Sequence, residues 1–331
     1  MKYTCLETAL AEIDSEDRFF QLLPGRVDPL LMRSVARIGV VEPIHLQLRP
    51  AMRAGEEPLA PHYRPVTGFR RLQAAAAAGL SHIPAMILPG EWDDLQVYRW
   101  LVQLKAALRP FSPLEASHAI AVLSGAFSLG MEEILRAWFP LMGLAPNPKL
   151  FGLYAPLRLL EPELQAALAA DELGIETAGT LAAAEPAERL AFWHLNKILR
   201  LGKNRQREFW LLLSDIARMK ATTLPGLLEE PACMSLFDEQ ALTPSQKADR
   251  FKSLLMKWRY PEYSATLARF EELLRAAKLP PQLHLRPTPW FAGEAYTIDL
   301  SFSTPAEFAA HLETLQEMLA RGLVDQLTEL T

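Results

Sequence analysis

A short stretch near residue 67 combines residue types that suit phosphate. Thr67 and Gly68 follow a short apolar run, and Phe69, Arg70 and Arg71 come directly after the glycine. The pattern predicts a strand, a tight turn and a helix start, where unpaired backbone N–H groups and the helix dipole attract anions. Guanidinium groups add forked donors for phosphate oxygens. The stretch predicts an anion-binding corner; the alternative is an ordinary turn with two solvated arginines.

A basic stretch further along the chain is a second candidate for binding. Residues 190–220 contain seven lysines and arginines and two acidic residues, a net charge of +5. Local positive charge of this kind suits the phosphate backbone of nucleic acid. The predicted DNA contacts are Lys197, Arg200, Lys203, Arg205 and Arg207. The alternative is a solvated basic face whose neighbouring aromatics, Phe209 and Trp210, lie in the core.

The composition excludes several other classes. The chain has 331 residues and a formal net charge of −5, so a nucleic-acid surface must be a local patch on an acidic background. Its two cysteines exclude a disulfide framework and a cysteine-ligated zinc site. The seven histidines lack the spacing of a helical metal site, so no metal ligands are predicted. Without a signal peptide or an apolar run of about 20 residues, the expected location is the cytoplasm, with no membrane contact.

The elements around residue 67 are expected to alternate in type. Aspartate and proline at 28–29 suit a helix start, and Gly39 suits its end. Period-two alternation favours strands, and Pro65 indicates an edge strand. The expected helices are 28–39 and 69–78, the expected strands are 43–48, 63–67 and 83–88, and residues 49–61 are expected to form a surface loop. Together these elements predict a small mixed α/β domain.

The rest of the chain is expected to be mainly helical. Capping boxes begin at Ser112 and Thr243, one helix spans 149–160, and residues 222–243 form a linker. The last hundred residues predict two helices, two strands and a final helix. The predicted fold class is an α+β multidomain protein. Its parts are a small α/β domain (1–91), a helical, DNA-binding domain (92–230) and a C-terminal α-α-β-β-α unit for association (231–331).

The N-terminal motifs and their order along the chain resemble those of the ParB N-terminal domain, a member of the ParB/sulfiredoxin superfamily. The matching segments are Arg37–Leu46, Val66–Ala74 and Gly79–Ile87, and the resemblance covers 13–88 and reaches Ser112–Ala116. It implies that Gly68, Arg70 and Arg71 contact the phosphates of a nucleotide, which is CTP in ParB. Gly39, Pro43 and Ile44 would help to shape the site. The full predicted nucleotide or phosphate site is Gly39, Pro43, Ile44, Thr67, Gly68, Phe69, Arg70 and Arg71.

The chain departs from the family at several positions. Phe69 replaces the glutamate of the family's box, and Leu104–Leu108 lacks the acidic and amide groups of the motif that supports magnesium binding. CTP hydrolysis is therefore expected to be weak or absent. The sulfiredoxin reaction needs a cysteine where Phe69 stands, so it has no nucleophile. The helix-turn-helix motif is also degenerate, because the connection 139–148 is long, apolar and proline-rich.

The predicted function is that of a bacterial, ParB-like binding or switch protein. Its expected ligands are DNA and CTP or another nucleotide, and it is expected to form a homo-oligomer. One alternative is a metal-dependent nuclease or nucleotide hydrolase, with carboxylates among Asp14, Asp17, Asp28 and Glu42 and with a divalent metal, Mg²⁺ or another. Another is a non-catalytic scaffold that keeps the fold without the ligand.

Overall fold

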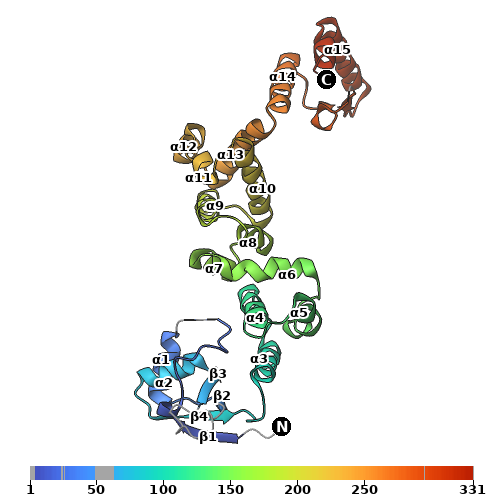
Figure 1. Ribbon diagram of the computed structural model, residues 1–331. Coiled ribbons are helices and arrows are strands. Elements are labelled where there is room, and N and C mark those ends of the chain that lie inside the picture. Colours follow the sequence, from blue (N-terminus) through green and yellow to red (C-terminus); the bar gives the residue numbers. More distant parts are fainter. Residues whose placement is uncertain (1–3, 24, 26, 49–62, 294, 331) are drawn as a thin grey trace. The chain divides into compact units, whose positions relative to one another are not determined.

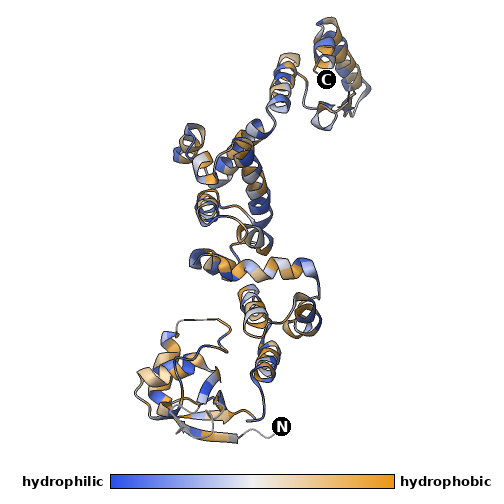
Figure 2. Ribbon diagram, in the orientation of Figure 1, coloured by the Kyte–Doolittle hydropathy of each residue, from blue (hydrophilic) through white to orange (hydrophobic). Residues whose placement is uncertain are grey.

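The computed structural model describes residues 4–330, except 24, 26, 49–62 and 294. The described chain separates into two compact units, residues 1–190 and 191–331. The expected surface loop at 49–61 lies outside the described residues. Figure 2 shows apolar and polar residues interspersed along the helices.

A four-stranded mixed sheet opens the first unit, in the order β1-β4-β2-β3 (Figure 1). The strands are β1 (Thr4–Ala9), β2 (Ile44–Leu48), β3 (Tyr63–Thr67) and β4 (His82–Ile87). β2 runs parallel to β4, while β1–β4 and β2–β3 are antiparallel pairs. The small α/β arrangement and the edge position of β3 are as predicted. β1 was not predicted, because the burial of its side chains does not follow their hydropathy. The apolar Leu6 is 46% exposed, whereas the polar Thr8 is 3% exposed.

Two helices pack with this sheet. α1 (Pro29–Ile38) starts where Asp28 accepts a hydrogen bond from the Leu30 N–H, and it ends at Gly39. α2 (Phe69–Ala77) follows β3 directly, with Gly68 between them. Both helices match the sequence prediction. Apolar side chains from α1, α2, β2 and β4 form a core cluster that includes Val35, Ile44, Leu46, Leu72 and Ile83.

The first unit continues as a series of helices. These are α3 (Asp94–Leu108), α4 (Pro113–Gly125), α5 (Met131–Ala137), η2 (Pro140–Met142), α6 (Pro148–Tyr154), η3 (Ala155–Leu159), α7 (Pro162–Ala169) and α8 (Ile175–Leu181). Ser112 forms the predicted capping box with Glu115. The prediction of a single helix at 149–160 is wrong. The α-helix ends at Tyr154 and a 3-10 helix begins at Ala155, because Pro156 has no N–H to donate.

A second core joins these helices to the end of the sheet. It contains Phe20, Val66 and Phe69 together with Tyr98 from α3 and Trp138 after α5, all buried. α5 and α6 are separated by a buried connection through Phe139 and Met142, so they do not form the short turn of a standard helix-turn-helix.

α9 (Pro186–Leu199) contains the division between the two units. The second unit then holds α10 (Lys203–Met219), α11 (Leu224–Leu228), α12 (Pro231–Asp238), α13 (Pro244–Arg259), α14 (Pro261–Ala277), β5 (Leu283–Pro287), η4 (Pro289–Phe291), β6 (Tyr296–Leu300), α15 (Pro305–Ala320) and α16 (Leu323–Thr328). The linker expected at 222–243 is wrong. α11 and α12 occupy it and bury Leu224, Leu227 and Cys233, but both helices are too short to show a clear period.

The chain is an α+β multidomain protein, as its sequence predicts. The α-α-β-β-α order of the last hundred residues is also confirmed in α13, α14, β5, β6 and α15, with two further short helices, α12 before them and α16 after them. The three-part division at 91 and 230 stays a prediction, as do homo-oligomer formation and the cytoplasmic location. Among the described residues, no helix combines the length and apolar character needed to cross a membrane.

Candidate functional site

The turn between β3 and α2 rests on the neighbouring strand. Gly68 caps α2 with a φ of +83° and without a side-chain capping bond. The position that a Cβ would take on Gly68 lies 2.4 Å from Cγ2 of Ile44, a fully buried side chain of β2. The glycine therefore serves two needs, a left-handed backbone and a close approach to β2. As at any helix start, the first N–H groups of α2 have no acceptor within the helix.

Polar side chains fix the strand end beside this turn. Nδ1 of His45 and Oγ1 of Thr67 are 2.7 Å apart, joining β2 to β3. The His45 ring also makes an edge contact with Trp100 of α3, with ring centroids 4.9 Å apart. Burial and the nearby Arg71 charge lower the pKa of His45, against a smaller opposing effect of Glu42. The imidazole is thus held mainly neutral at pH 7, and it connects the turn to α3.

Arg71 attaches α2 to the loop that precedes β2. One of its terminal nitrogens donates to the backbone carbonyls of Glu42 (2.6 Å) and Pro43 (3.0 Å). The same nitrogen lies 2.8 Å from the Glu42 carboxylate. Burial lowers the pKa of Arg71, and the Glu42 charge partly offsets this effect. Arg71 therefore positions the loop at 42–43 beside the turn.

Arg70 differs from its neighbour in exposure. Its side chain is exposed, and its Nε lies 4.0 Å from the position that a Cβ would take on Gly25. The guanidinium is thus accessible near both the start of α2 and the segment before α1. Of the two arginines, Arg70 is the more exposed, and Arg71 is the one bonded to the 42–43 loop.

Two other predicted site residues have structural positions. The Phe69 side chain is 9% exposed and packs in the core, with Arg18 5.8 Å above its ring. The Phe69 side chain therefore belongs to the core. Gly39 ends α1 with a φ of +76°, and no described group lies within 4 Å of its Cβ position. The structure therefore gathers Pro43, Ile44, Thr67, Gly68 and Arg71 at the turn, without showing Gly39 in contact with them.

The carboxylates considered for metal-assisted chemistry have other partners. Glu42 pairs with Arg71, and Asp28 accepts the Leu30 N–H at the start of α1. Asp14 and Asp17 accept backbone N–H groups of the turns that follow them. Within the described parts of the chain, no three or more His, Cys, Asp or Glu side chains are grouped to hold a metal ion.

A buried ion cluster near residue 105 was not anticipated. The Glu115 side chain is 5% exposed and accepts from Lys105 (3.2 Å) and from both terminal nitrogens of Arg109 (2.9 and 2.7 Å). Sequence reasoning recognised Glu115 only as a capping residue. The i+10 and i+6 separations give no local signal, because the three residues meet only when α3 and α4 fold together.

The basic stretch lies at the junction of α9 and α10. α10 begins at Gly202 without a side-chain cap and without an acidic residue in its first turn. Lys197, Arg200, Lys203 and Arg207 are exposed, whereas Arg205 pairs with Asp249 of α13 at 2.8 Å and lies over the Phe209 ring. Phe209 and Trp210 are buried, as expected. Cations at a helix N-terminus are repelled by the positive end of the helix dipole, and a bound anion would reduce this repulsion.

The chain matches no protein-family model. It matches no curated protein either. It is similar to a solved structure of the C-terminally truncated chromosome-partitioning protein ParB from Caulobacter crescentus with CTP-gamma-S, at 25% identity and a TM-score of 0.25. That match covers 55% of this chain and 94% of the other.

Two further solved structures are similar. The Caulobacter crescentus ParB complexed to the centromeric parS site is 21% identical, with a TM-score of 0.37, and the match covers 62% of this chain and 97% of that one. A Pnob8-like ParB-N domain is 13% identical, with a TM-score of 0.39 and coverage of 78% and 98%. These three solved structures are of ParB proteins, the family that the N-terminal motifs resemble.

Proposed function

We propose that the chain is a ParB-like binding protein that takes the phosphates of a nucleotide, CTP or another, at the turn after β3. One observation carries the proposal. The N-terminus of α2 lies directly against β2 at Gly68, with Arg70 exposed and Arg71 holding the 42–43 loop beside it. Backbone N–H groups, a helix dipole and an accessible guanidinium together form the donor set that phosphate oxygens require.

We propose binding without efficient hydrolysis at this turn. Hydrolysis assisted by a metal needs carboxylates directed at the phosphates. Here the Glu42 carboxylate is held by Arg71, and the residue after Gly68 is a buried phenylalanine. The stretch 104–108 contains no acidic residue. The ligand would then act by being bound and released, as in a switch.

Isothermal titration calorimetry with CTP, ATP and GTP, each with Mg²⁺, tests the nucleotide proposal. We expect saturable binding of at least one nucleotide, and Arg70→Ala should weaken it at least tenfold, or about 1.4 kcal/mol. Arg33→Ala is the matched control, because Arg33 is an exposed arginine on α1. Phosphate release measured in the same samples should stay near the background rate.

Two results would contradict this proposal. If the folded chain bound none of the three nucleotides, the scaffold that has lost its ligand would be the better description. Rapid phosphate release that disappears in Glu42→Gln would instead favour the hydrolase alternative.

We propose, second, that the exposed cations at the junction of α9 and α10 contact DNA phosphates. The supporting observation is a cluster of exposed lysines and arginines beside the uncapped start of α10. Fluorescence anisotropy with a labelled DNA duplex measures this contact. The double variant Lys203→Gln/Arg207→Gln should weaken binding at least tenfold.

The control for the DNA experiment removes two exposed cations elsewhere in the same unit. Lys257 on α13 and Arg269 on α14 serve this purpose, so Lys257→Gln/Arg269→Gln should bind DNA as the unchanged chain does. Equal weakening in both double variants would indicate a general charge effect and would contradict a contact at α10.

A further inference from the structure

Three aromatic side chains meet at the surface of the second unit, where the loop after β5 contacts the start of α14. We call Tyr260, Tyr263 and Trp290 the aromatic cluster. Trp290 in η4 is 56% exposed, and the two tyrosines are half-buried. The Trp290 ring centroid lies 5.0 Å from that of Tyr260 and 4.8 Å from that of Tyr263, at interplanar angles of 62° and 49°. The rings are in contact but tilted, and more than half of Trp290 stays open to solvent.

The backbone holds Trp290 in this position against its own preference. Trp290 and Phe291 have φ values of +62° and +53°, in the left-handed region that side chains disfavour. Thr288 fixes the loop, because its hydroxyl accepts from the Gly293 N–H (3.0 Å) and donates to the Gly293 carbonyl (2.9 Å). The Phe291 ring packs on the core residue Phe270, with centroids 5.7 Å apart. Strain that the surroundings hold in place in this way is concentrated at functional sites.

The polar ends of the aromatic cluster are available to a ligand. The hydroxyls of Tyr260 and Tyr263 and the indole N–H of Trp290 form no hydrogen bond with a described residue. Neither hydroxyl is among the buried atoms that lack a partner, so both reach solvent. An indole N–H can only donate, and a phenol hydroxyl also donates one hydrogen bond. The cluster therefore offers donors to an occupant that is rich in acceptors.

A quaternary ammonium group does not fit between these rings. The rings of an aromatic cage surround such a cation, each within about 6 Å of it. In the aromatic cluster the indole touches both phenols, with centroids 5.0 and 4.8 Å apart, which leaves no room for a cation between them.

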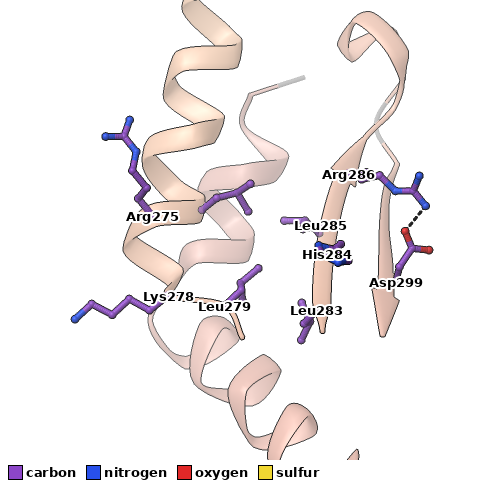
Figure 3. Close-up of a pocket in the computed structure, with 9 residues that line it drawn as sticks. Arg275, Lys278, Leu279, Leu283, His284, Leu285, Arg286 and Asp299 are labelled. Atoms are coloured by element: carbon purple, nitrogen blue, oxygen red, sulfur yellow. Dashed lines mark hydrogen bonds and ion pairs between the residues drawn. The ribbon is translucent and has the colours of Figure 1, made fainter. Parts of the chain in front are cut away.

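The neighbouring charges do not favour single-stranded nucleic acid, which needs cations beside the stacking rings. Arg259 lies over the Tyr260 ring, 4.9 Å from its centroid, and its Nε is 3.9 Å from the Asp215 carboxylate. Arg286, which precedes the loop, pairs with Asp299 of β6 (Figure 3). Neither guanidinium is thus free to hold a phosphate backbone beside the rings.

We propose that the aromatic cluster binds a proline-rich segment of a partner protein in the polyproline II conformation. Proline rings are apolar and uncharged, and proline-rich segments dock on exposed aromatic side chains. A polyproline II helix has no internal hydrogen bonds, so its carbonyl groups are free to accept from the indole and phenol donors. Proline itself has no N–H that would need an acceptor. The fixed loop presents Trp290 in one orientation, which reduces the entropy lost on binding.

Fluorescence anisotropy of the full chain with labelled decaproline tests the proposal. Decaproline should bind saturably, and a glycine-serine peptide of equal length should bind at least tenfold more weakly. Trp290→Gly should weaken decaproline binding at least tenfold, and it relieves the backbone strain at a φ of +62°, so the variant should stay folded. Tyr263→Phe, which removes only a hydroxyl, should also weaken binding, by a smaller factor. Phe302→Ala is the control, because Phe302 is a 55% exposed aromatic residue outside the cluster.

Nuclear magnetic resonance of the indole N–H groups locates the peptide. The signal that is absent from Trp290→Gly identifies Trp290, and decaproline should shift this signal more than those of the other tryptophans. Four results would overturn the proposal: no binding at millimolar decaproline, equal binding of the glycine-serine peptide, unchanged affinity in Trp290→Gly, or an unmoved Trp290 signal. Displacement of decaproline by oligothymidylate would assign the cluster to nucleic acid. An oligomer that dissociates in Trp290→Gly would assign it to a second copy. Either of these outcomes also overturns the proposal.

Discussion

At the scale of single residues, the turn at the start of α2 depends on the absence of a side chain at Gly68. An alanine there would adopt a φ of +83° and bring its Cβ to 2.4 Å from Ile44. Left-handed strain and displacement of the buried Ile44 side chain both oppose this change. We expect Gly68→Ala to lower the free energy of unfolding by about 2–4 kcal/mol, measured by urea denaturation.

Gly79→Ala is the matched control for that measurement. Gly79 also has a positive φ, +71°, but no described group lies within 4 Å of its Cβ position. Only backbone strain should then count, at about 1 kcal/mol. Equal losses in the two variants would show that the contact with Ile44 is not what requires glycine at 68.

The cluster around Glu115 makes stability depend on pH. Burial alone would raise the pKa of Glu115, but hydrogen bonds from the Ser112 N–H, Arg109 and Lys105 outweigh burial and lower it. A carboxylate whose folded pKa is lowered adds stability above its unfolded pKa and loses it as the pH falls through the folded value. Glu115→Gln should therefore cost about 2–3 kcal/mol at pH 7, and this cost should shrink as the pH falls from the unfolded pKa of about 4.3 through the lower folded pKa.

Denaturant titrations of both proteins from neutral to acidic pH measure this difference. Glu133→Gln is the control, since Glu133 is an exposed glutamate on α5 and its substitution should leave the pH profile unchanged. A constant gap between Glu115→Gln and the unchanged chain at every pH would contradict the ionic origin of the effect.

The residues of the turn illustrate what a sequence can and cannot predict. The position of Gly68 between a strand and a helix follows from local patterns, and so does the exposure of a helix N-terminus. The attachment of Arg71 to Glu42 and Pro43 does not follow, because the partners are 29 and 28 residues away and both acceptors are backbone carbonyls. The burial of Phe69 likewise depends on packing against α3 and α4, and the sequence of residues 67–71 contains no signal for that packing.

At the scale of elements, Arg64 joins the sheet to α3. Its guanidinium pairs with Asp94 at the start of α3, donates to Oε1 of Gln47 at 2.9 Å and lies 4.7 Å from the Phe20 ring. Its side chain is 13% exposed. Arg64→Leu would leave Gln47 and Asp94 without this donor, so we expect a loss of about 2–3 kcal/mol and faster hydrogen exchange across 94–108.

Arg33→Leu provides the comparison for this prediction, because Arg33 is exposed on α1 and should not affect exchange in α3. Unchanged exchange across 94–108 in Arg64→Leu would mean that apolar packing alone holds α3 to the sheet.

The elements themselves were predictable where a strong local signal marks them. α1, α2 and α13 begin at capping residues, prolines or a glycine turn, and their positions match the prediction. β1 was missed because tertiary contacts bury its threonine and expose its leucine. α11 and α12 were missed because helices of 5 and 8 residues contain too few turns for a periodic pattern.

At the scale of the whole molecule, charge is distributed unevenly. The chain carries −5 overall and +5 within residues 190–220, so the remaining residues carry −10. An acidic background repels DNA phosphates, and binding must depend on the local cations of α9 and α10. Of the five predicted contacts, Arg205 is half-buried and pairs with Asp249, whereas the other four are exposed.

Salt dependence measures that number of contacts directly. Each phosphate neutralised on duplex DNA adds about −0.9 to the slope of log K against log salt, so four contacts predict about −3.6 between roughly 50 and 200 mM salt. Removing two cations in Lys203→Gln/Arg207→Gln should reduce the slope to about −1.8, whereas Lys257→Gln/Arg269→Gln should leave it unchanged. A slope near zero would rule out phosphate contact, and an unchanged slope in the first variant would place the contact elsewhere on the molecule. Because counterion release counts charges whatever the DNA sequence, this result holds for any duplex.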